Sequence, residues 1–433
     1  MAFLIYIFFF LTTLALAAPT TSRLKSRSFQ VDRVQRNGYV AHGPAALSKA
    51  YRKFNISSTT TATTASTNSG FQALNFKPIN HRYRNKHNAA VGTNSTSAGQ
   101  NGTVATTSVD GDVEFVSPVS IGGQTIMMDF DTGSSDLWVF SSELSAADQK
   151  SHTVFDTQKS STFKKMQGAT FKISYGDGSS ASGNVGTDVV NIGGASVQTQ
   201  AVELATQVSG SFLAETASNG LVGLAFSNLN TVSPTQQKTF FDNIASQLDE
   251  PVMTVSLKSD SSKGAYEFGT IDSTKYTGKI ANISVDPTNG FWQFTSASFK
   301  VGDNGDTKQM TTTTVAIADT GTSLMLVSPE AAQGYYEQVE GSVNSEEVGG
   351  YMFPCNAQLP TFTVAVGKST ATIPSNVVSF AQVGTDMSGT EYCYGGIQSS
   401  EDSKFMIFGD VFLKTMFVIF DQRGPSLGLA TSA

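Results

Sequence analysis

The sequence predicts a mostly β protein that consists of two similar halves and contains few short helices. Two observations predict this fold class. The 433 residues include 39 glycines, and many short β-branched runs end at turn residues. This pattern is typical of strands joined by tight turns. In addition, one motif occurs once in each half of the chain, which indicates an internal duplication.

The repeated motif is an apolar run that ends in Asp-Thr-Gly and is followed by small hydroxyl residues. Its first copy covers residues 127–135 and its second covers residues 315–323. A single Asp-Thr-Gly is usually a surface turn. Two copies behind apolar runs instead predict two buried strands, each of which carries one carboxylate to a tight turn.

A second repeated element supports the duplication. A hydrophobic-hydrophobic-Gly sequence follows each motif, and its glycine lies 92 residues after Asp131 in one half (Gly223) and 90 residues after Asp319 in the other (Gly409). Burying a carboxylate at the end of a strand costs free energy, so such a group is expected to have an interaction partner or a functional role. We therefore expect the two aspartates to share one site.

The N-terminus has the pattern of a signal peptide at residues 1–18. These residues carry no charged side chain, and an apolar run from Phe3 to Leu16 ends in small residues. A signal anchor is the alternative, but the run is short for a membrane span. No later stretch is long enough to cross a bilayer. The sequence therefore predicts a secreted, extracellular protein without a membrane segment.

Residues 19–109 form a basic leader, the name used below for this segment. They contain 12 Lys and Arg against one acid, for a net charge of +11, whereas the rest of the chain carries −18. A basic segment can bind nucleic acid or an anionic surface. Behind a signal peptide and ahead of an acidic body, an intramolecular partner is the better interpretation, so we expect no nucleic-acid partner.

Within the leader, residues 45–54 have helical spacing, whereas residues 57–69 form a Ser/Thr/Ala tract without a core-forming pattern. Residues 89–109 are small and polar, as in a processed linker. The chain also contains four Asn-X-Ser/Thr sequons, which are possible N-glycosylation sites in this compartment. They begin at Asn55, Asn94, Asn101 and Asn282.

After the leader, residues 114–121 alternate and end at a Gly-Gly turn, which predicts a strand and a hairpin. Residues 170–183 predict a second hairpin around Gly-Asp-Gly. Helices are expected to begin at Ser233-Pro234 and at Ser328-Pro329. Their apolar stripes predict packing rather than a binding site. The stripes contain Phe240, Phe241, Ile244 and Leu248 in one helix and Tyr335, Tyr336 and Val339 in the other.

The second half begins near residues 285–291, where Asp-Pro-Thr-Asn-Gly interrupts the strands and predicts the connection between the halves. The pattern of the final stretch, residues 405–430, predicts a strand, a short helix after Gly409-Asp410 and a further strand.

The chain contains two cysteines, Cys355 and Cys393. In a secreted chain the simplest expectation is that they form one disulfide. All four histidines lie far from them in the sequence, so we expect no metal site and no cofactor.

Together, the Asp-Thr-Gly motifs, the hydrophobic-hydrophobic-Gly elements and Ile-Ser-Tyr-Gly-Asp-Gly-Ser at residues 173–179 resemble a pepsin-type aspartic protease. The resemblance runs from about Gly111 to Ala433 and is greatest to secreted fungal enzymes of the penicillopepsin and aspergillopepsin type. It implies a bilobal pepsin-like fold in which lobes at 110–286 and 287–433 flank a cleft. The leader would then be a propeptide and processed linker at 19–109.

The resemblance also implies the roles of individual residues. Asp131 and Asp319 would be catalytic and would share one proton. Six neighbours would support them: Thr132, Gly133, Ser134, Thr320, Gly321 and Thr322. A flap, a hairpin that closes over substrate, would contain Tyr175, Gly176, Asp177 and Ser179, and its tyrosine would be hydrogen-bonded by Trp138. In fungal relatives an Asp-Gly-Ser at the position of residues 177–179 accompanies acceptance of lysine beside the cut.

Family propeptides place a basic side chain beside the two aspartates, and four residues are candidates for it here: Lys77, Arg82, Arg84 and Lys86. The leader would loosen when carboxylates protonate. Other expected partners are extended peptides with large apolar side chains and pepstatin-like inhibitors. The enzyme is expected to be a monomer.

The sequence thus predicts a secreted aspartic endopeptidase made as a zymogen. The main alternative is a catalytically silent pepsin-like protein that only binds protein partners. A glycosidase also uses two acids but needs no duplicated Asp-Thr-Gly. A Ser-His-Asp hydrolase is disfavoured because His152 is the only histidine after the leader and no Gly-X-Ser-X-Gly elbow is present.

Overall fold

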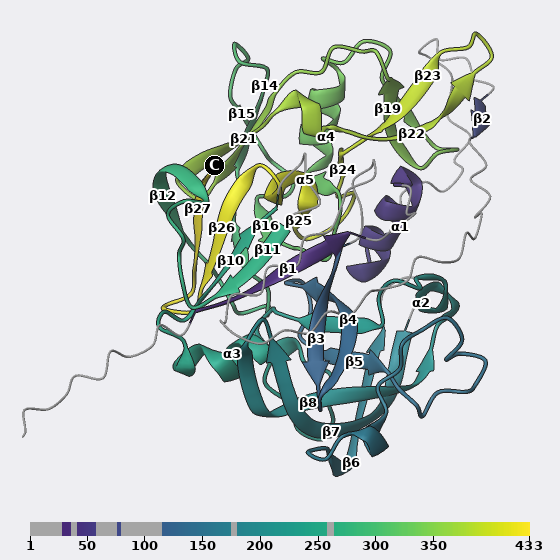
Figure 1. Cartoon of the computed structure of the whole chain (residues 1–433). Coiled ribbons are helices and arrows are strands. Elements are labelled where there is room, and N and C mark those ends of the chain that lie inside the picture. The colour runs from purple at the N-terminus through teal and green to yellow at the C-terminus, as the bar shows by residue number, and fades with distance from the viewer. Residues whose placement is uncertain (1–27, 36–40, 58–75, 79–114, 175–179, 258–263) are drawn as a thin grey trace, which may run out of the picture.

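The computed structural model describes residues 28–35, 41–57, 76–78, 115–174, 180–257 and 264–433. Within these residues the chain consists mainly of strands, with few short helices, and forms two strand-rich halves with the leader helix between them (Figure 1). This confirms the predicted fold class.

The strands fall into three groups along the chain. The leader contains β1 (Phe29–Gln35) and β2 (Phe76–Pro78). The first half contains β3 (Phe115–Ile121), β4 (Gln124–Asp131), β5 (Leu137–Phe140), β6 (Lys164–Ser174), β7 (Ser180–Ile192), β8 (Ala195–Val208), β9 (Gly220–Gly223), β10 (Val252–Ser256), β11 (Gly264–Phe268) and β12 (Tyr276–Ser284). The second half contains β13 (Gln293–Thr295), β14 (Ser298–Val301), β15 (Lys308–Gln309), β16 (Val315–Ala318), β17 (Met325–Val327), β18 (Val343–Ser345), β19 (Gly350–Pro354), β20 (Phe362–Val366), β21 (Ser369–Ile373), β22 (Ser379–Asp386), β23 (Glu391–Gly395), β24 (Ile397–Ser399), β25 (Met406–Phe408), β26 (Met416–Asp421) and β27 (Ser426–Ser432).

The helices are short. The α-helices are α1 (Gly43–Lys53), α2 (Gly210–Ala214), α3 (Phe240–Ile244), α4 (Pro329–Tyr336) and α5 (Asp410–Leu413). The 3₁₀ turns are η1 (Thr157–Lys159), η2 (Ser227–Leu229), η3 (Ala245–Gln247) and η4 (Ser375–Val377).

One 13-stranded sheet runs through both halves in the order β12-β27-β26-β10-β11-β1-β3-β4-β9-β5-β8-β7-β6. The leader strand β1 lies inside this sheet, antiparallel to β11 on one side and to β3 on the other. In the second half, three smaller sheets have the orders β13-β16-β25-β17-β24, β15-β14-β20-β21 and β18-β19-β23-β22-β2. The last of these pairs the leader strand β2 with β22.

The duplication seen in the sequence is present in the strand pairing. In the first half, β4 is parallel to β9, β9 is antiparallel to β5, and β5 is parallel to β8. In the second half, β16, β25, β17 and β24 repeat this arrangement with the same directions. In each half the strand that leads to the aspartate therefore lies beside the strand that leads to the repeated glycine.

Close backbone contacts explain why glycine ends each repeated element. A Cβ on Gly223 would lie 2.5 Å from the Cα of Ser135, and a Cβ on Gly409 would lie 2.2 Å from the carbonyl oxygen of Thr322. Real side chains do not approach the backbone this closely, so each Asp-Thr-Gly turn fits only against a glycine.

The predicted helices agree with the structure in part. The helix predicted at residues 45–54 is α1, and the one predicted at Pro329 is α4. The predicted start at Ser233-Pro234 is wrong because Ser233 exchanges backbone hydrogen bonds with Thr170 in β6. The helix begins at Phe240 instead, after Thr239 accepts a hydrogen bond from the N–H of Asp242.

The predicted hairpin around Gly-Gly is the β3–β4 hairpin, and the strand, helix and strand predicted at the C-terminus are β25, α5, β26 and β27.

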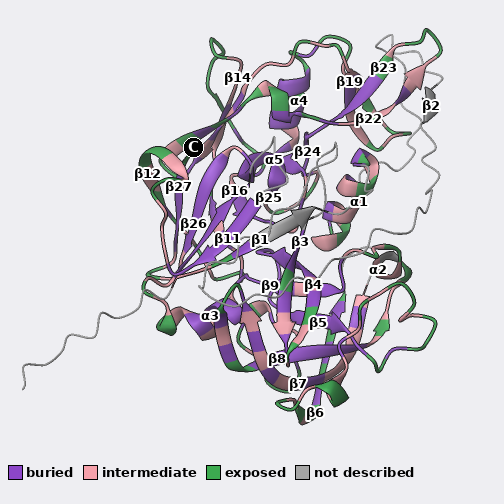
Figure 2. Ribbon diagram, in the orientation of Figure 1, coloured by how far each residue is buried: buried purple, intermediate pink, exposed green. Residues whose placement is uncertain are grey.

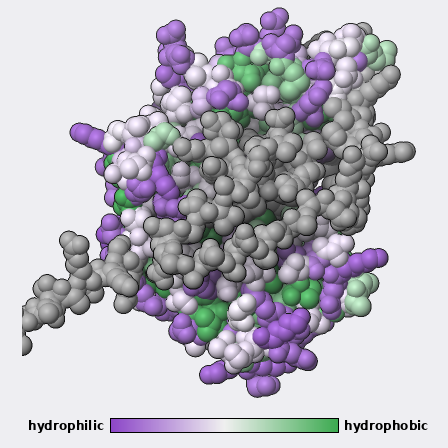
Figure 3. Space-filling view, viewed as in Figure 1, coloured by the Kyte–Doolittle hydropathy of each residue, from purple (hydrophilic) through white to green (hydrophobic). Residues whose placement is uncertain are grey.

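The central strands of both halves are buried (Figure 2). The face in Figure 3 carries hydrophilic residues at its outer ends and hydrophobic residues in small separate patches. Among the described helices, none has the length and apolar character needed to span a bilayer.

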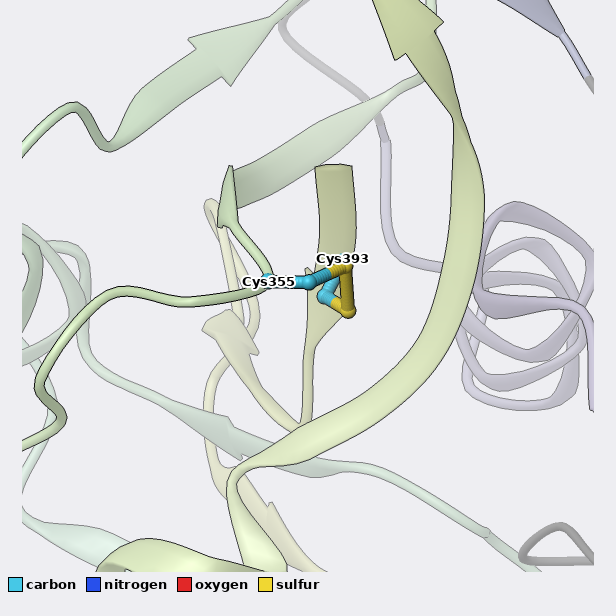
Figure 4. Close-up of a disulfide and its surroundings, with 2 residues drawn as sticks. All are labelled: Cys355 and Cys393. Carbon is cyan, nitrogen blue, oxygen red and sulfur yellow. A yellow bond between two sulfur atoms is a disulfide. The ribbon is translucent and has the colours of Figure 1, made fainter. Parts of the chain in front are cut away.

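The predicted disulfide between Cys355 and Cys393 is present (Figure 4). It joins the chain just after β19 to β23, two strands that already pair in the same sheet. The cross-link closes a separation of 38 residues, so it restricts the unfolded chain within the second half.

Candidate active site

Asp131 and Asp319 lie on two turns that are hydrogen-bonded to each other across the halves. Asp131 ends β4, and Asp319 directly follows β16. The N–H of Thr132 donates to Thr320 Oγ1 (3.1 Å), and the N–H of Thr320 donates to Thr132 Oγ1 (3.0 Å). Each hydroxyl then donates to a carbonyl of the opposite strand, that of Ala318 (2.9 Å) or Phe130 (2.7 Å). These bonds fix one turn against the other.

Each carboxylate also receives the same two hydrogen bonds from its own turn. Asp131 Oδ1 accepts from the N–H of Gly133 (2.8 Å), and its Oδ2 accepts from Ser134 Oγ (2.6 Å). Asp319 repeats this pattern with the N–H of Gly321 (3.1 Å) and with Thr322 Oγ1 (2.5 Å). The six supporting neighbours predicted from the sequence therefore all lie at this site.

The two glycines bring each turn close to the carboxylate of the other half. A Cβ on Gly133 would lie 2.6 Å from Asp319 Oδ1, and a Cβ on Gly321 would lie 2.5 Å from Asp131 Oδ1. Both distances are shorter than any ordinary side-chain contact. The close approach of the two carboxylates therefore depends on the absence of side chains at these positions.

The basic side chain beside the aspartates is Lys53, and the prediction of Lys77, Arg82, Arg84 or Lys86 is wrong. Lys53 Nζ lies 2.6 Å from Asp131 Oδ1 and 2.8 Å from Asp319 Oδ2, and only 8% of its side chain is exposed. Lys77 lies on β2, paired with Thr385 of β22. Arg82, Arg84 and Lys86 lie outside the described residues.

Lys53 reaches the aspartates because α1 packs against both halves (Figure 1). On the second half, Tyr51 donates to the carbonyl of Ser399 (2.9 Å), and the Phe54 ring lies 5.5 Å from that of Phe405. On the first half, Lys49 forms an ion pair with Glu215 (3.5 Å). The sequence placed Lys53 in a helix, but a cation in the last turn is favourable in any helix, so this position alone does not indicate contact with the aspartates.

The surroundings give the two carboxyl groups different pKa values. Burial raises the pKa of Asp319 to about 6; the Lys53 ammonium opposes this, and the Asp131 carboxylate adds to it. Burial also acts on Asp131, but Lys53 outweighs it and holds the pKa of Asp131 below its usual range. In turn, the two carboxylates overcome the burial of Lys53 and raise its pKa.

The base of the predicted flap is the antiparallel β6–β7 hairpin, which is described as far as Ser174 and Ser180. Four predicted flap residues, Tyr175, Gly176, Asp177 and Ser179, lie outside the described residues. Trp138, on β5, is 1% exposed and packs edge-on against Phe212. Its Nε1 is buried and has no hydrogen-bond partner within the described part of the chain.

The remaining predicted sites are the four sequons. Asn55 and Asn282 are exposed, whereas Asn94 and Asn101 lie outside the described residues. No group of three or more His, Cys, Asp or Glu residues suited to a metal ion occurs among the residues that the structure describes.

Comparison with known proteins gives a consistent result. The family model described as eukaryotic aspartyl protease matches residues 114–432. An aspergillopepsin A-like aspartic endopeptidase of Aspergillus fumigatus is 53% identical over 419 residues, which cover 96% of this chain and 95% of the relative. Penicillopepsin-1 of Penicillium rubens is 46% identical, covering 84% of this chain and 89% of its own. Aspergillopepsin-1 of Aspergillus fumigatus is also 46% identical, covering 80% and 86% respectively.

Proposed function

This chain belongs to the eukaryotic aspartyl protease family, and from that membership we propose that it is a secreted aspartic endopeptidase that hydrolyses peptide bonds in proteins at acidic pH. One observation supports the proposal most directly. A single ammonium, that of Lys53, hydrogen-bonds to both Asp131 and Asp319. A water molecule placed between the carboxylates would reach both in the same way.

The proposed chemistry follows from the closeness of the two acids. Two adjacent buried carboxyl groups do not both ionise easily, so Asp131 and Asp319 share one proton in acid. The ionised member takes a proton from water, and the protonated member donates to the carbonyl oxygen of the peptide. A tetrahedral intermediate forms and collapses when the leaving amine is protonated. No covalent bond to the enzyme is needed.

We also propose that the chain is made as a zymogen. Residues 1–18 would be the signal peptide and residues 19–109 the propeptide and linker, followed by lobes at 110–286 and 287–433. Lys53 occupies the position that the attacking water needs, so the leader has to leave before substrate binds. A basic leader on an acidic body is held by ion pairs at neutral pH and is weakened when carboxylates protonate.

Substrate recognition rests on the predicted flap. Tyr175 at its tip would cover an extended peptide and accept the hydrogen bond of Trp138, whose buried Nε1 needs a partner. Gly176 and Ser179 would complete the turn, and Asp177 would favour lysine beside the cut. Kinetics of Asp177→Asn on matched lysine and leucine peptides test this last role, because an equal loss on both peptides would contradict it.

The proposal extends to partners and modification. A monomeric enzyme would take extended peptides with large apolar side chains and would be inhibited by pepstatin-like compounds. Glycans could occupy the exposed residues Asn55 and Asn282, as well as Asn94 and Asn101. Peptide mapping before and after glycosidase treatment tests their occupancy.

The central experiment is hydrolysis of denatured haemoglobin or casein after acid treatment of the full chain, with and without pepstatin. We expect pepstatin-sensitive cleavage that is abolished by Asp131→Asn or Asp319→Asn. Asp286→Asn is a matched control, because Asp286 is an aspartate on the surface and its loss should leave cleavage unchanged. A folded protein that has lost its leader but cleaves neither substrate would instead support a silent binding protein.

A further inference from the structure

A second pair of acidic side chains lies buried beside the turn that carries Asp131. Asp136 directly precedes β5, five residues after Asp131. Glu203 extends from β8, where it is opposite Trp138 of β5 in the parallel pairing. Both acids are only 1% exposed, and neither takes part in the chemistry proposed above.

The pair is surrounded by hydrogen bonds that tie three segments together. Asp136 Oδ1 accepts from the N–H and the hydroxyl of Thr231, both at 2.9 Å. Asn230 Nδ2 lies 3.0 Å from Glu203 Oε1, 3.2 Å from Asp136 Oδ1 and 3.2 Å from the carbonyl of Ser135. The cluster therefore connects the Asp131 turn, β8 and the loop that contains residues 230 and 231.

This cluster has more acceptors than donors. The Asn230 amide has two hydrogens, yet three acceptor oxygens surround it. The Oε2 atom of Glu203 is buried and makes no hydrogen bond of normal geometry within the described residues, and the N–H of Leu137 is the one backbone donor that acts on this carboxyl group there. An ionised carboxylate can only accept, so two ionised acids here would leave an acceptor unsatisfied. One additional proton would correct this imbalance.

The charges around the pair do not supply a cation. Asp131, on the adjacent turn, is negative and acts on Asp136. Thr231 and Asn230, on the loop, are neutral, and β8 contributes Glu203 itself. Among the described residues, no lysine, arginine or histidine forms an ion pair with either acid. Burial, and then the charge of Asp136, raises the pKa of Glu203 well above its usual range, and burial raises that of Asp136.

We propose that Glu203 retains a proton and donates it to Asp136, and that this shared proton positions the Asp131 turn. Asp136 is well placed for this role because its backbone carbonyl accepts from the N–H of Gly223 (2.9 Å), while the next N–H, that of Leu224, donates to the carbonyl of Asp131 (2.8 Å). When the proton leaves to solvent, two adjacent carboxylates repel each other and loosen this connection.

The direction of the pH effect follows from the preference of the folded state for the protonated acid. Such a group contributes stability that is complete below its ordinary pKa, 4.5 for Glu203, and is lost as the pH rises through the raised pKa. The first half of the chain should therefore lose stability as the pH rises above about 5. This inference is independent of catalysis, because it concerns folding and not the reaction of Asp131 and Asp319.

The test uses the full-length chain and two substitutions, Glu203→Gln and Asp136→Asn. Each amide supplies an N–H in place of the shared proton. Thermal unfolding is followed by circular dichroism from pH 5 to pH 8. We expect the Tm of each variant, relative to the Tm of the wild type, to increase by a few degrees for each pH unit as the pH rises.

Glu267→Gln is the matched control, since Glu267 is also a buried glutamate but pairs with Lys275 at 2.8 Å. It should shift Tm by the same amount at every pH in this range. Hydrogen exchange of peptides that cover residues 131–140 supplies the local readout. Corrected for intrinsic rates, exchange should increase between pH 5 and pH 8 in the wild type but not in Glu203→Gln.

Parallel Tm curves for the wild type and both variants would overturn the proposal. If one variant does not fold, the dependence of Tm on pH in the other variant tests the proposal. A further measurement needs no variant: the infrared spectrum of the wild type at pH 7 in D₂O should contain the carbonyl stretch of a protonated carboxylic acid. Its absence would show that Glu203 is ionised and would also overturn the proposal.

Discussion

Thr132 and Thr320 exchange hydrogen bonds in both directions, with each backbone N–H donating to the other residue's hydroxyl oxygen at 3.1 and 3.0 Å. The two residues come from different halves of the chain. Because each also precedes a glycine that faces the opposite carboxylate, this exchange fixes the separation of Asp131 and Asp319. The geometry of the site is therefore a property of the contact between the halves.

Thr132→Val should lower both stability and peptide hydrolysis. Valine keeps the shape of threonine but leaves the N–H of Thr320 and the carbonyl of Ala318 without their partner. An unsatisfied buried group costs about 1 to 3 kcal/mol, so the free energy of unfolding should fall by about 2 kcal/mol or more. Urea unfolding and initial rates at acid pH measure the two effects. Thr132→Ser keeps the hydroxyl and should retain most of the stability and most of the hydrolysis rate. If the valine and serine variants had the same stability and the same rate, the role of the hydroxyl would be contradicted.

Gly321→Ala should reduce kcat far more than it reduces stability. The new Cβ would lie 2.5 Å from Asp131 Oδ1, so the carboxylate or the turn has to move, and displaced catalytic groups lose large factors in rate. We expect at least a roughly 100-fold loss of kcat. Gly210→Ala is the control, because a Cβ there meets nothing within 4 Å. A Gly321→Ala enzyme with wild-type kcat would show that the close approach is not required.

Asp319→Asn should flatten the pH dependence of stability of the full-length chain between pH 4 and pH 6. Burial raises the pKa of Asp319 from 3.8 to about 6. A raised carboxyl pKa contributes stability that is complete below the ordinary value and is lost as the pH rises through the raised value. The loss in the wild type should be on the order of 2 kcal/mol, and asparagine does not titrate. Chemical unfolding at pH 4, 5 and 6 measures it. Identical slopes for the two proteins would be inconsistent with this assignment.

The sequence predicted the part of the site that is built from local, repeated geometry. Each Asp-Thr-Gly turn and its later glycine can be found in the sequence because the same backbone contacts occur twice. In contrast, Lys53 could not be chosen among the leader's cations, since its position depends on how α1 packs between the halves. The helix start at Ser233 was mispredicted for a related reason: its backbone pairs with Thr170, which lies 63 residues earlier.

Lys53→Met should weaken the attachment of the leader to the rest of the chain. Methionine keeps an unbranched stem of similar length but removes the ammonium that hydrogen-bonds to both Asp131 and Asp319. Loss of one partner of a buried ion pair costs about 3 to 5 kcal/mol, and uptake of a proton by the two acids offsets part of this cost.

Limited proteolysis at pH 7 measures the effect, because a loosely held leader is cleaved first. We expect the leader of Lys53→Met to be cleaved at least about ten times faster than that of the wild type. Lys49→Met is the control on the same helix. Its 3.5 Å pair with Glu215 is partly exposed, and such pairs contribute little to stability. In the wild type, the contact between Lys53 and Asp131 should persist as the pH falls toward 3.8. Lys53 holds the pKa of Asp131 below that value. The stabilisation from this contact is therefore lost only as the pH falls through the lowered pKa. If both lysine variants kept their leaders as well as the wild type, the attachment would have to depend on the apolar contacts of α1 and not on Lys53.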